Sequence, residues 1–147
     1  MKRIIDFITE KFKINSKTVT KQDNEVVFDL NKGDKFPTQK EIDIIENLTY
    51  KLPLLPDKVY TSNSRIVFRY NRSPEKQTED GYHIHNSISI HCGFINSMKK
   101  FSISFSSIDQ QQPIRYEAHT QYIEDCFKSI NFLWKRIDFS EVIEKYR

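Results

Sequence analysis

Two runs in the middle of the chain alternate strictly between apolar and polar residues. The first spans Tyr82–His91, where even positions are mostly apolar and odd positions are His or Ser, and the second spans Phe101–Ser106. Successive side chains of a strand point to opposite faces, so each run predicts a strand with one apolar and one polar face. A turn at residues 96–97 would join them as a hairpin with Ile90 opposite Ile103, and a slip of one residue would mix the faces.

Apolar side chains that recur every three or four residues predict the helices. Thr38 is expected to cap one of them, with Glu41 as its capping-box partner, and Pro53 is expected to end it. The longest such pattern covers residues 115–137, and we expect Phe127 of this helix to be buried in the core. The other predicted helices cover residues 3–12 and 138–146, and the other predicted strands cover residues 17–20, 25–30, 58–60 and 65–70.

This order of elements predicts an α+β fold. Short connections favour antiparallel neighbours, so we expect one mainly antiparallel sheet of about five or six strands. The long C-terminal helix is expected to pack on the apolar face of this sheet. No internal repeat and no linker divides the chain, which indicates a single domain over residues 1–147.

The opposite, polar face of the sheet is expected to lie open to water or to a partner. Its predicted members alternate with the apolar positions, and they are Arg65, Arg69, His83, His85, Ser87, Ser89, Ser102 and Ser104. The wholly polar segment Asn71–Asp80 is long for a loop between strands. We therefore predict that the polar face or this segment contacts another chain.

The composition is that of a folded globular domain. Of the 147 residues, 37% are hydrophobic and 29% are charged, which excludes a disordered chain of low hydrophobicity. No stretch approaches the roughly 20 apolar residues of a membrane span, and the N-terminus lacks the apolar run of a signal sequence. We expect a cytoplasmic protein, or a virion protein if a phage encodes it, with no membrane partner.

The best candidate pair of metal ligands is His83 and His85, which lie two residues apart on one strand and therefore on one face. Such a site needs further ligands, and His91 lies too far along the strand to supply one. Cys92 points away from the neighbouring His91, so we interpret it as a buried structural residue and not as a nucleophile. With only three Gly, the chain has neither a phosphate-binding loop nor a nucleophile elbow. We expect no cofactor, no metal and no catalytic residue.

Three hypotheses for function remain, and the first is a non-catalytic structural or adaptor protein within a larger assembly of protein chains. Phe94, Ile95 and Met98 would contact the partner, because a two-residue turn carries them beyond the sheet. A chain rich in Ile, Lys and Asn and poor in Ala suits a small bacteriophage virion or neck component, and equally a protein of an AT-rich bacterium.

The second hypothesis is a nucleic-acid-binding accessory protein. A net charge of +3 is too small to indicate nucleic-acid binding by itself. Basic residues nevertheless cluster near the N-terminus, at Lys2, Arg3, Lys11, Lys13, Lys17 and Lys21. Arg65 and Arg69 form a second cluster on the sheet, and sheet faces with Arg and aromatic side chains bind single strands. The third hypothesis is an enzyme that uses the His, Arg and Ser side chains of the polar face.

Overall fold

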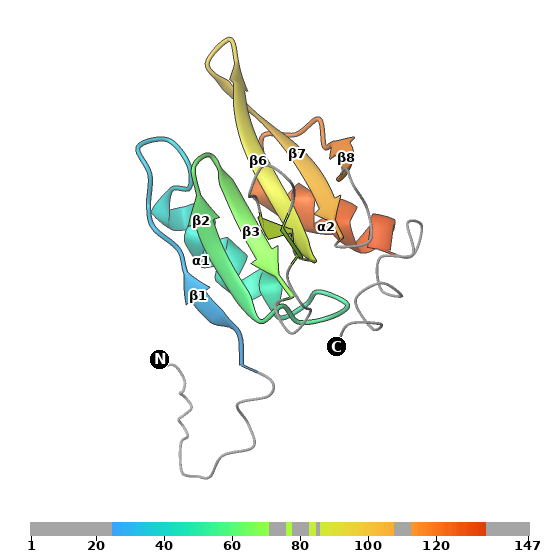
Figure 1. Cartoon of the computed structure of the whole chain (residues 1–147). Coiled ribbons are helices and arrows are strands. Elements are labelled where there is room, and N and C mark those ends of the chain that lie inside the picture. The colour runs from blue at the N-terminus through green and yellow to red at the C-terminus, as the bar shows by residue number, and fades with distance from the viewer. Residues whose placement is uncertain (1–24, 71–75, 78–82, 85, 108–112, 135–147) are drawn as a thin grey trace, which may run out of the picture.

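In the part of the chain that the computed structural model describes, the main sheet has six strands in the order β1-β2-β3-β6-β7-β8 (Figure 1). The described residues are 25–70, 76–77, 83–84, 86–107 and 113–134. The strands of the main sheet are β1 (Val27–Asp29), β2 (Lys58–Ser62), β3 (Arg65–Arg69), β6 (Ser87–Ile95), β7 (Met98–Ser106) and β8 (Ile114–Glu117). The other described elements are the helices α1 (Gln39–Thr49) and α2 (Ile123–Trp134) and a separate sheet of β4 (Lys76–Gln77) and β5 (His83–Ile84).

Neighbouring strands of the main sheet run antiparallel, except that β1 and β2 are parallel. The chain passes through α1 between these two strands, and a crossover through a helix brings the chain back in the same direction. This one parallel pair is compatible with a sheet that is mainly antiparallel. The predicted α+β fold, with one mainly antiparallel sheet in a single domain, is confirmed.

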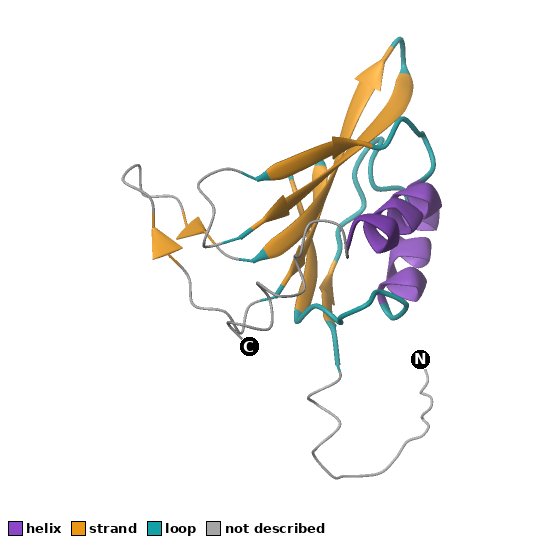
Figure 2. Ribbon diagram, turned by 90° about the vertical axis from the view of Figure 1, so that its right-hand side faces the viewer, coloured by secondary structure: helices purple, strands orange, loops and turns teal. Residues whose placement is uncertain are grey.

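Both helices cover the same face of the main sheet (Figure 2). The hydrophobic core lies between this face and the two helices. Phe127 of α2 is 3% exposed, and its ring meets the ring of Phe68 from β3 edge to face, with the centroids 5.6 Å apart. The predicted burial of Phe127 is confirmed. Residues with no exposed surface come from the helices and from the sheet. They include Ile45, Val59, Ile66, Phe68, Ile88, Ile90, Phe101, Ile103, Phe105, Cys126 and Ile130.

The predicted register of the central hairpin is confirmed. Ile90 lies opposite Ile103, and the polar Ser89 lies opposite Ser104 on the other face. Asn96 and Ser97 form the turn with φ of 51° and 68°. Positive φ at both central residues is the geometry of the two-residue turn whose twist matches that of the strands. The sequence pattern and the turn therefore specify the same pairing.

The predicted strand over residues 82–91 is wrong at its beginning. The ladder with β3 starts only at Ser87, and His83 lies in β5, which pairs with β4. Both views place β4 and β5 on the side of the main sheet opposite the helices (Figures 1 and 2). His83 therefore does not belong to the polar face of the main sheet, and His85 lies outside the described residues.

The helix predicted over residues 115–137 is also wrong at its beginning. Residues 114–117 form β8 at the edge of the sheet, and α2 starts only at Ile123. Between them His119 takes a φ of 54°, which interrupts any regular element. The Thr120 hydroxyl accepts a hydrogen bond from the Tyr122 N–H and donates one to Asp125, so it starts the helix locally.

The capping box of α1 is confirmed, because the Thr38 hydroxyl accepts from the Glu41 N–H and the Glu41 carboxylate accepts from the Thr38 N–H. The helix ends at Thr49, one turn before Pro53. The elements predicted at residues 3–12, 17–20 and 138–146 lie outside the described residues, as do residues 135–137 of the predicted long helix.

Candidate functional site

The β6–β7 hairpin extends further than the strands beside it. β3 pairs with β6 only as far as His91, and β8 pairs with β7 only from Ser102 onward. Among the described strands, none pairs with the outer half of the hairpin, residues 93–100, which projects beyond the sheet (Figure 1). Phe94 lies three residues beyond His91, where the pairing with β3 ends. Three residues of a strand span about 10 Å, so the end of the hairpin projects by about that length beyond β3.

The projecting end carries the apolar residues that the sequence singled out. Phe94 is 44% exposed, Ile95 57% and Met98 56%. We call these three side chains the hairpin tip. Ile95 and Met98 lie opposite each other on one face of the hairpin, whereas Phe94 lies opposite Lys99 on the face that continues the core. The hairpin tip therefore presents apolar surface in two directions.

A shallow, open cleft of about 450 Å³ lies beside Ile95 and Met98. Its far wall comes from the segment that precedes α2, including His119 and Tyr122. Tyr122 is 57% exposed, so the apolar surface of the hairpin continues across the cleft onto an aromatic ring. Tyr122 was missed by the sequence analysis, which placed it in the middle of a helix.

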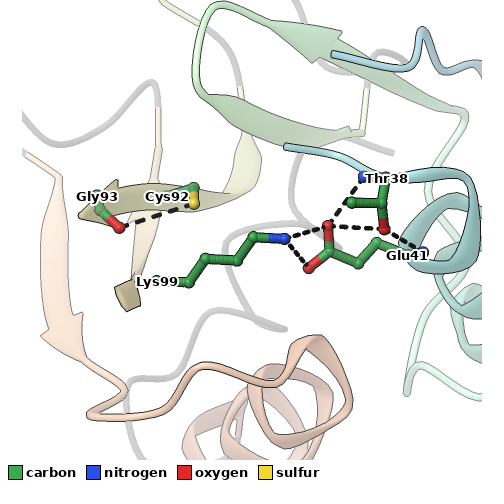
Figure 3. A network of polar contacts seen from close by, with 5 residues as sticks. All are labelled: Thr38, Glu41, Cys92, Gly93 and Lys99. Carbon is green, nitrogen blue, oxygen red and sulfur yellow. Dashed lines mark hydrogen bonds and ion pairs between the residues drawn. The ribbon is translucent and has the colours of Figure 1, made fainter. Parts of the chain in front are cut away.

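An ion pair at Lys99, the residue opposite Phe94, joins the projecting half to α1 (Figure 3). Lys99 Nζ lies 2.9 Å from each carboxylate oxygen of Glu41, the residue that also completes the capping box with Thr38. The same ammonium group lies 5.7 Å from the centre of the Phe36 ring, which in turn packs on Phe101 with centroids 5.4 Å apart. These contacts hold the hairpin in one orientation, so its tip is pre-organised.

Neither cysteine has the properties of a nucleophile. Cys92 is buried, as predicted, and burial is the largest cause that raises the pKa of its thiol to about 11. Lys99 acts in the opposite direction, but it is neutralised by Glu41. Burial also raises the pKa of the Cys126 thiol to about 12. Both thiols therefore stay protonated near neutral pH, and a thiolate is the species that attacks a substrate.

The polar face of the main sheet is less accessible than expected. Four of its serines are only 3–6% exposed, namely Ser87, Ser89, Ser102 and Ser104. Longer side chains hydrogen-bond to two of them, because Arg115 donates to the Ser102 hydroxyl over 3.1 Å and His91 Nε2 lies 3.1 Å from the Ser104 hydroxyl. The expectation that this face is open to water is wrong for these four serines. The hydroxyls of Ser102 and Ser104 make internal contacts instead.

Arg65 and Arg69 of β3 add positive charge to this face. Arg65 is half-buried and lies opposite His91 in the adjacent strand. Burial, and then the charges of Arg65 and Arg115, lower the pKa of His91. In the described part of the chain Arg65 makes no ion pair, so its charge remains available to an anion. Arg69 is also half-buried, four residues further along β3.

The structure does not bring all of the predicted site residues together. Arg65 lies opposite His91, three residues before Phe94 of the hairpin tip, and Arg69 lies opposite Ser87, seven residues before Phe94. His83 is placed only by the backbone pairing of β5. Several predicted site residues lie outside the described residues, namely His85, Lys2, Arg3, Lys11, Lys13, Lys17 and Lys21, and so does most of the segment 71–80.

Within the described ranges, no group of three His, Cys, Asp or Glu side chains is arranged to hold a metal ion. Neither described helix has the length and apolar character needed to cross a membrane.

Comparison of this chain with protein-family models, with curated protein sequences and with solved structures finds no significant match.

Proposed function

We propose that this protein is a non-catalytic structural or adaptor protein that binds another protein chain through the hairpin tip. The observation that supports this proposal is the exposure of Phe94, Ile95 and Met98, at 44%, 57% and 56%, on a hairpin that projects beyond its sheet. Large apolar side chains gathered on one projection are typical of protein interaction sites.

The charges around the hairpin tip indicate the chemistry of the partner. Lys35 Nζ lies 5.4 Å from the centre of the Phe94 ring, and the exposed Lys100 lines the cleft beside Met98. A matching surface therefore has an apolar groove at its centre and carboxylates at its rim. The ion pair between Lys99 and Glu41 fixes the hairpin before binding, which lowers the ordering cost of association.

The contribution of the hairpin tip to the binding free energy can be estimated from the side-chain area that is still exposed. Full burial of an apolar side chain of this size contributes about 1.5–3 kcal/mol, and roughly half of that remains to be gained for each of the three residues. Together they would contribute about 2–4 kcal/mol, which corresponds to about a 30- to 1,000-fold change in Kd.

The test is a triple substitution of the hairpin tip, F94S/I95S/M98S. The partner is first identified by mass spectrometry of the complex that co-purifies from the source cells, and its affinity is then measured by titration calorimetry with purified components. We expect the triple variant to lose affinity by at least about 30-fold. Val27→Ser is the matched control, because Val27 is 58% exposed on β1 at the other edge of the sheet. A triple variant that binds as tightly as the wild type would refute the proposal.

One observation favours nucleic-acid binding as a second candidate. Arg65 carries a charge without an ion pair in the described part of the chain, and it lies opposite His91, whose pKa is lowered by burial and then by the charges of Arg65 and Arg115. A single-stranded oligonucleotide bound there would lose affinity with salt at a log–log slope of roughly −0.7 per phosphate contact, and Arg65→Gln would reduce that slope. The affinity for a protein partner at the hairpin tip would depend only weakly on salt.

The third hypothesis, an enzyme that uses the polar face of the main sheet, has less support because the serine hydroxyls of that face are buried.

A further inference from the structure

The strand β8 lies at an edge of the main sheet and has one strand neighbour, β7, among the described residues. The Ala118 N–H donates to the Phe101 carbonyl, and the Phe101 N–H donates to the Thr120 carbonyl. Even-numbered residues of this segment therefore direct their backbone groups toward β7. Because these directions alternate along a strand, Arg115 and Glu117 direct their N–H and C=O groups outward, away from the sheet.

The same two residues carry opposite charges on one face. Arg115 and Glu117 are both exposed and lie on the face of the sheet opposite the helices. In the described part of the chain neither side chain makes an ion pair, and Arg115 uses one of its donors on Ser102. An unpaired strand edge is a template for another strand, and these charges determine which strand fits.

The edge of β8 is complementary to itself. If a second copy pairs antiparallel about a two-fold axis at Tyr116, Arg115 lies opposite Glu117 of the second copy, and the reverse pair forms on the other side of the axis. Both pairs consist of residues with outward backbone groups, so each exchanges two N–H···O bonds, as in a hydrogen-bonded antiparallel pair.

The neighbouring two-fold registers are disfavoured. An axis at Arg115 places two arginines directly opposite each other, and an axis at Glu117 does the same with two glutamates. Like charges that face each other across strands are destabilising, whereas opposite charges are stabilising. Backbone geometry and charge therefore select the same register.

We infer that β8 binds a second copy of this chain, edge to edge about a two-fold axis at Tyr116, so that two main sheets become one continuous sheet. A cleft of about 330 Å³ between β8 and α2, lined in part by Tyr116, Ala118 and Leu133, lies on the helix side of the same edge and adds apolar area to the contact. Four residues of strand alone bury less than the roughly 1,000 Å² of a stable interface, so the dimer depends on concentration. This surface is separate from the hairpin tip, so the two proposals stand independently.

The experiment uses charge reversal and complementation on the full chain. Sedimentation equilibrium should show the mass rising with concentration from the 17.6 kDa of one chain toward twice that value. Arg115→Glu alone and Glu117→Arg alone each turn two attractive pairs into repulsive ones, so each should weaken dimerisation by about tenfold or more. An equimolar mixture of these two variants restores complementary pairs in the heterodimer, as does the swap R115E/E117R in one chain, and both should dimerise like the wild type.

Circular dichroism of the variants should match that of the wild type, because both side chains are exposed and their replacement should not prevent folding. The hairpin variant F94S/I95S/M98S should dimerise like the wild type, so a failure of the adaptor proposal leaves this result unchanged. The inference is overturned if the wild type keeps the mass of one chain up to about millimolar concentration. It is also overturned if the two reversed variants dimerise separately as well as they do together.

Discussion

Replacing Glu41 by Gln tests how firmly the projecting hairpin is fixed to α1. Gln at this position can still accept the hydrogen bond from the Thr38 N–H, because Gln also completes capping boxes. The substitution therefore removes the charge that faces Lys99 and leaves the start of the helix intact. Lys99→Met is the matched partner substitution, since it keeps most of the aliphatic chain beside Phe36.

The expected loss in the free energy of unfolding follows from the geometry and burial of the pair of Lys99 and Glu41. Lys99 Nζ is 2.9 Å from both carboxylate oxygens, and the side chains of Lys99 and Glu41 are 22% and 10% exposed. Exposed ion pairs contribute about 0.2–1 kcal/mol, while hydrogen bonds to charged groups contribute about 1.5–3 kcal/mol. We expect Glu41→Gln to lower the free energy of unfolding by about 2 kcal/mol, which moves the urea midpoint by about 1 M.

The assay is a double-mutant cycle by urea unfolding with E41Q, K99M and E41Q/K99M. The expected coupling energy between the two side chains is about 1–2 kcal/mol. If the coupling is below about 0.3 kcal/mol, which is the usual scatter for independent sites, the ion pair does not hold the hairpin. The argument that the tip is pre-organised would then be wrong.

Two further predictions concern the core and the polar face. Phe127→Ala should lower the free energy of unfolding by about 3–5 kcal/mol, because the ring is 3% exposed and packs on Phe68, and an unchanged denaturation midpoint would show that this ring is not in the core. Because the pKa of His91 is lowered in the folded protein, the unfolded chain binds more protons below its pKa of about 6.5, so stability should fall as pH drops through and below that value. Urea unfolding at about pH 8 and pH 5 should show a smaller loss for His91→Gln than for the wild type, and equal losses would contradict this account.

Local periodicity was sufficient to predict the hairpin and α1. The alternation in β6 and β7 extends over enough residues to specify both the faces and the register, and the Asn96-Ser97 turn agrees with it. The capping box of α1 depends on two residues three positions apart, so it is visible in the sequence. In these elements every local preference favours the same structure.

Short or non-local features could not be predicted in this way. The residues of β8 fit both a period of two and a spacing of three to four, and a run of four residues does not separate these patterns. The pairing of Lys99 with Glu41 joins positions 58 residues apart, so only the fold brings them together. The burial of Ser102 and Ser104 depends in part on Arg115 and His91 from neighbouring strands, whereas alternation shows only which face a side chain occupies.

The backbone bond between β3 and β6 has a consequence for how this fold can grow. The Tyr70 N–H donates to the Asn86 carbonyl over 3.0 Å, so the chain leaves the main sheet and re-enters it at the same point of the ladder. Everything between these two residues is topologically an insertion, and a two-residue turn would join the same two strands. The entropy of closing a loop rises only slowly with its length. This junction is therefore the place where a guest domain could be spliced into the chain, or the existing segment excised, while the pairing of β3 with β6 is kept.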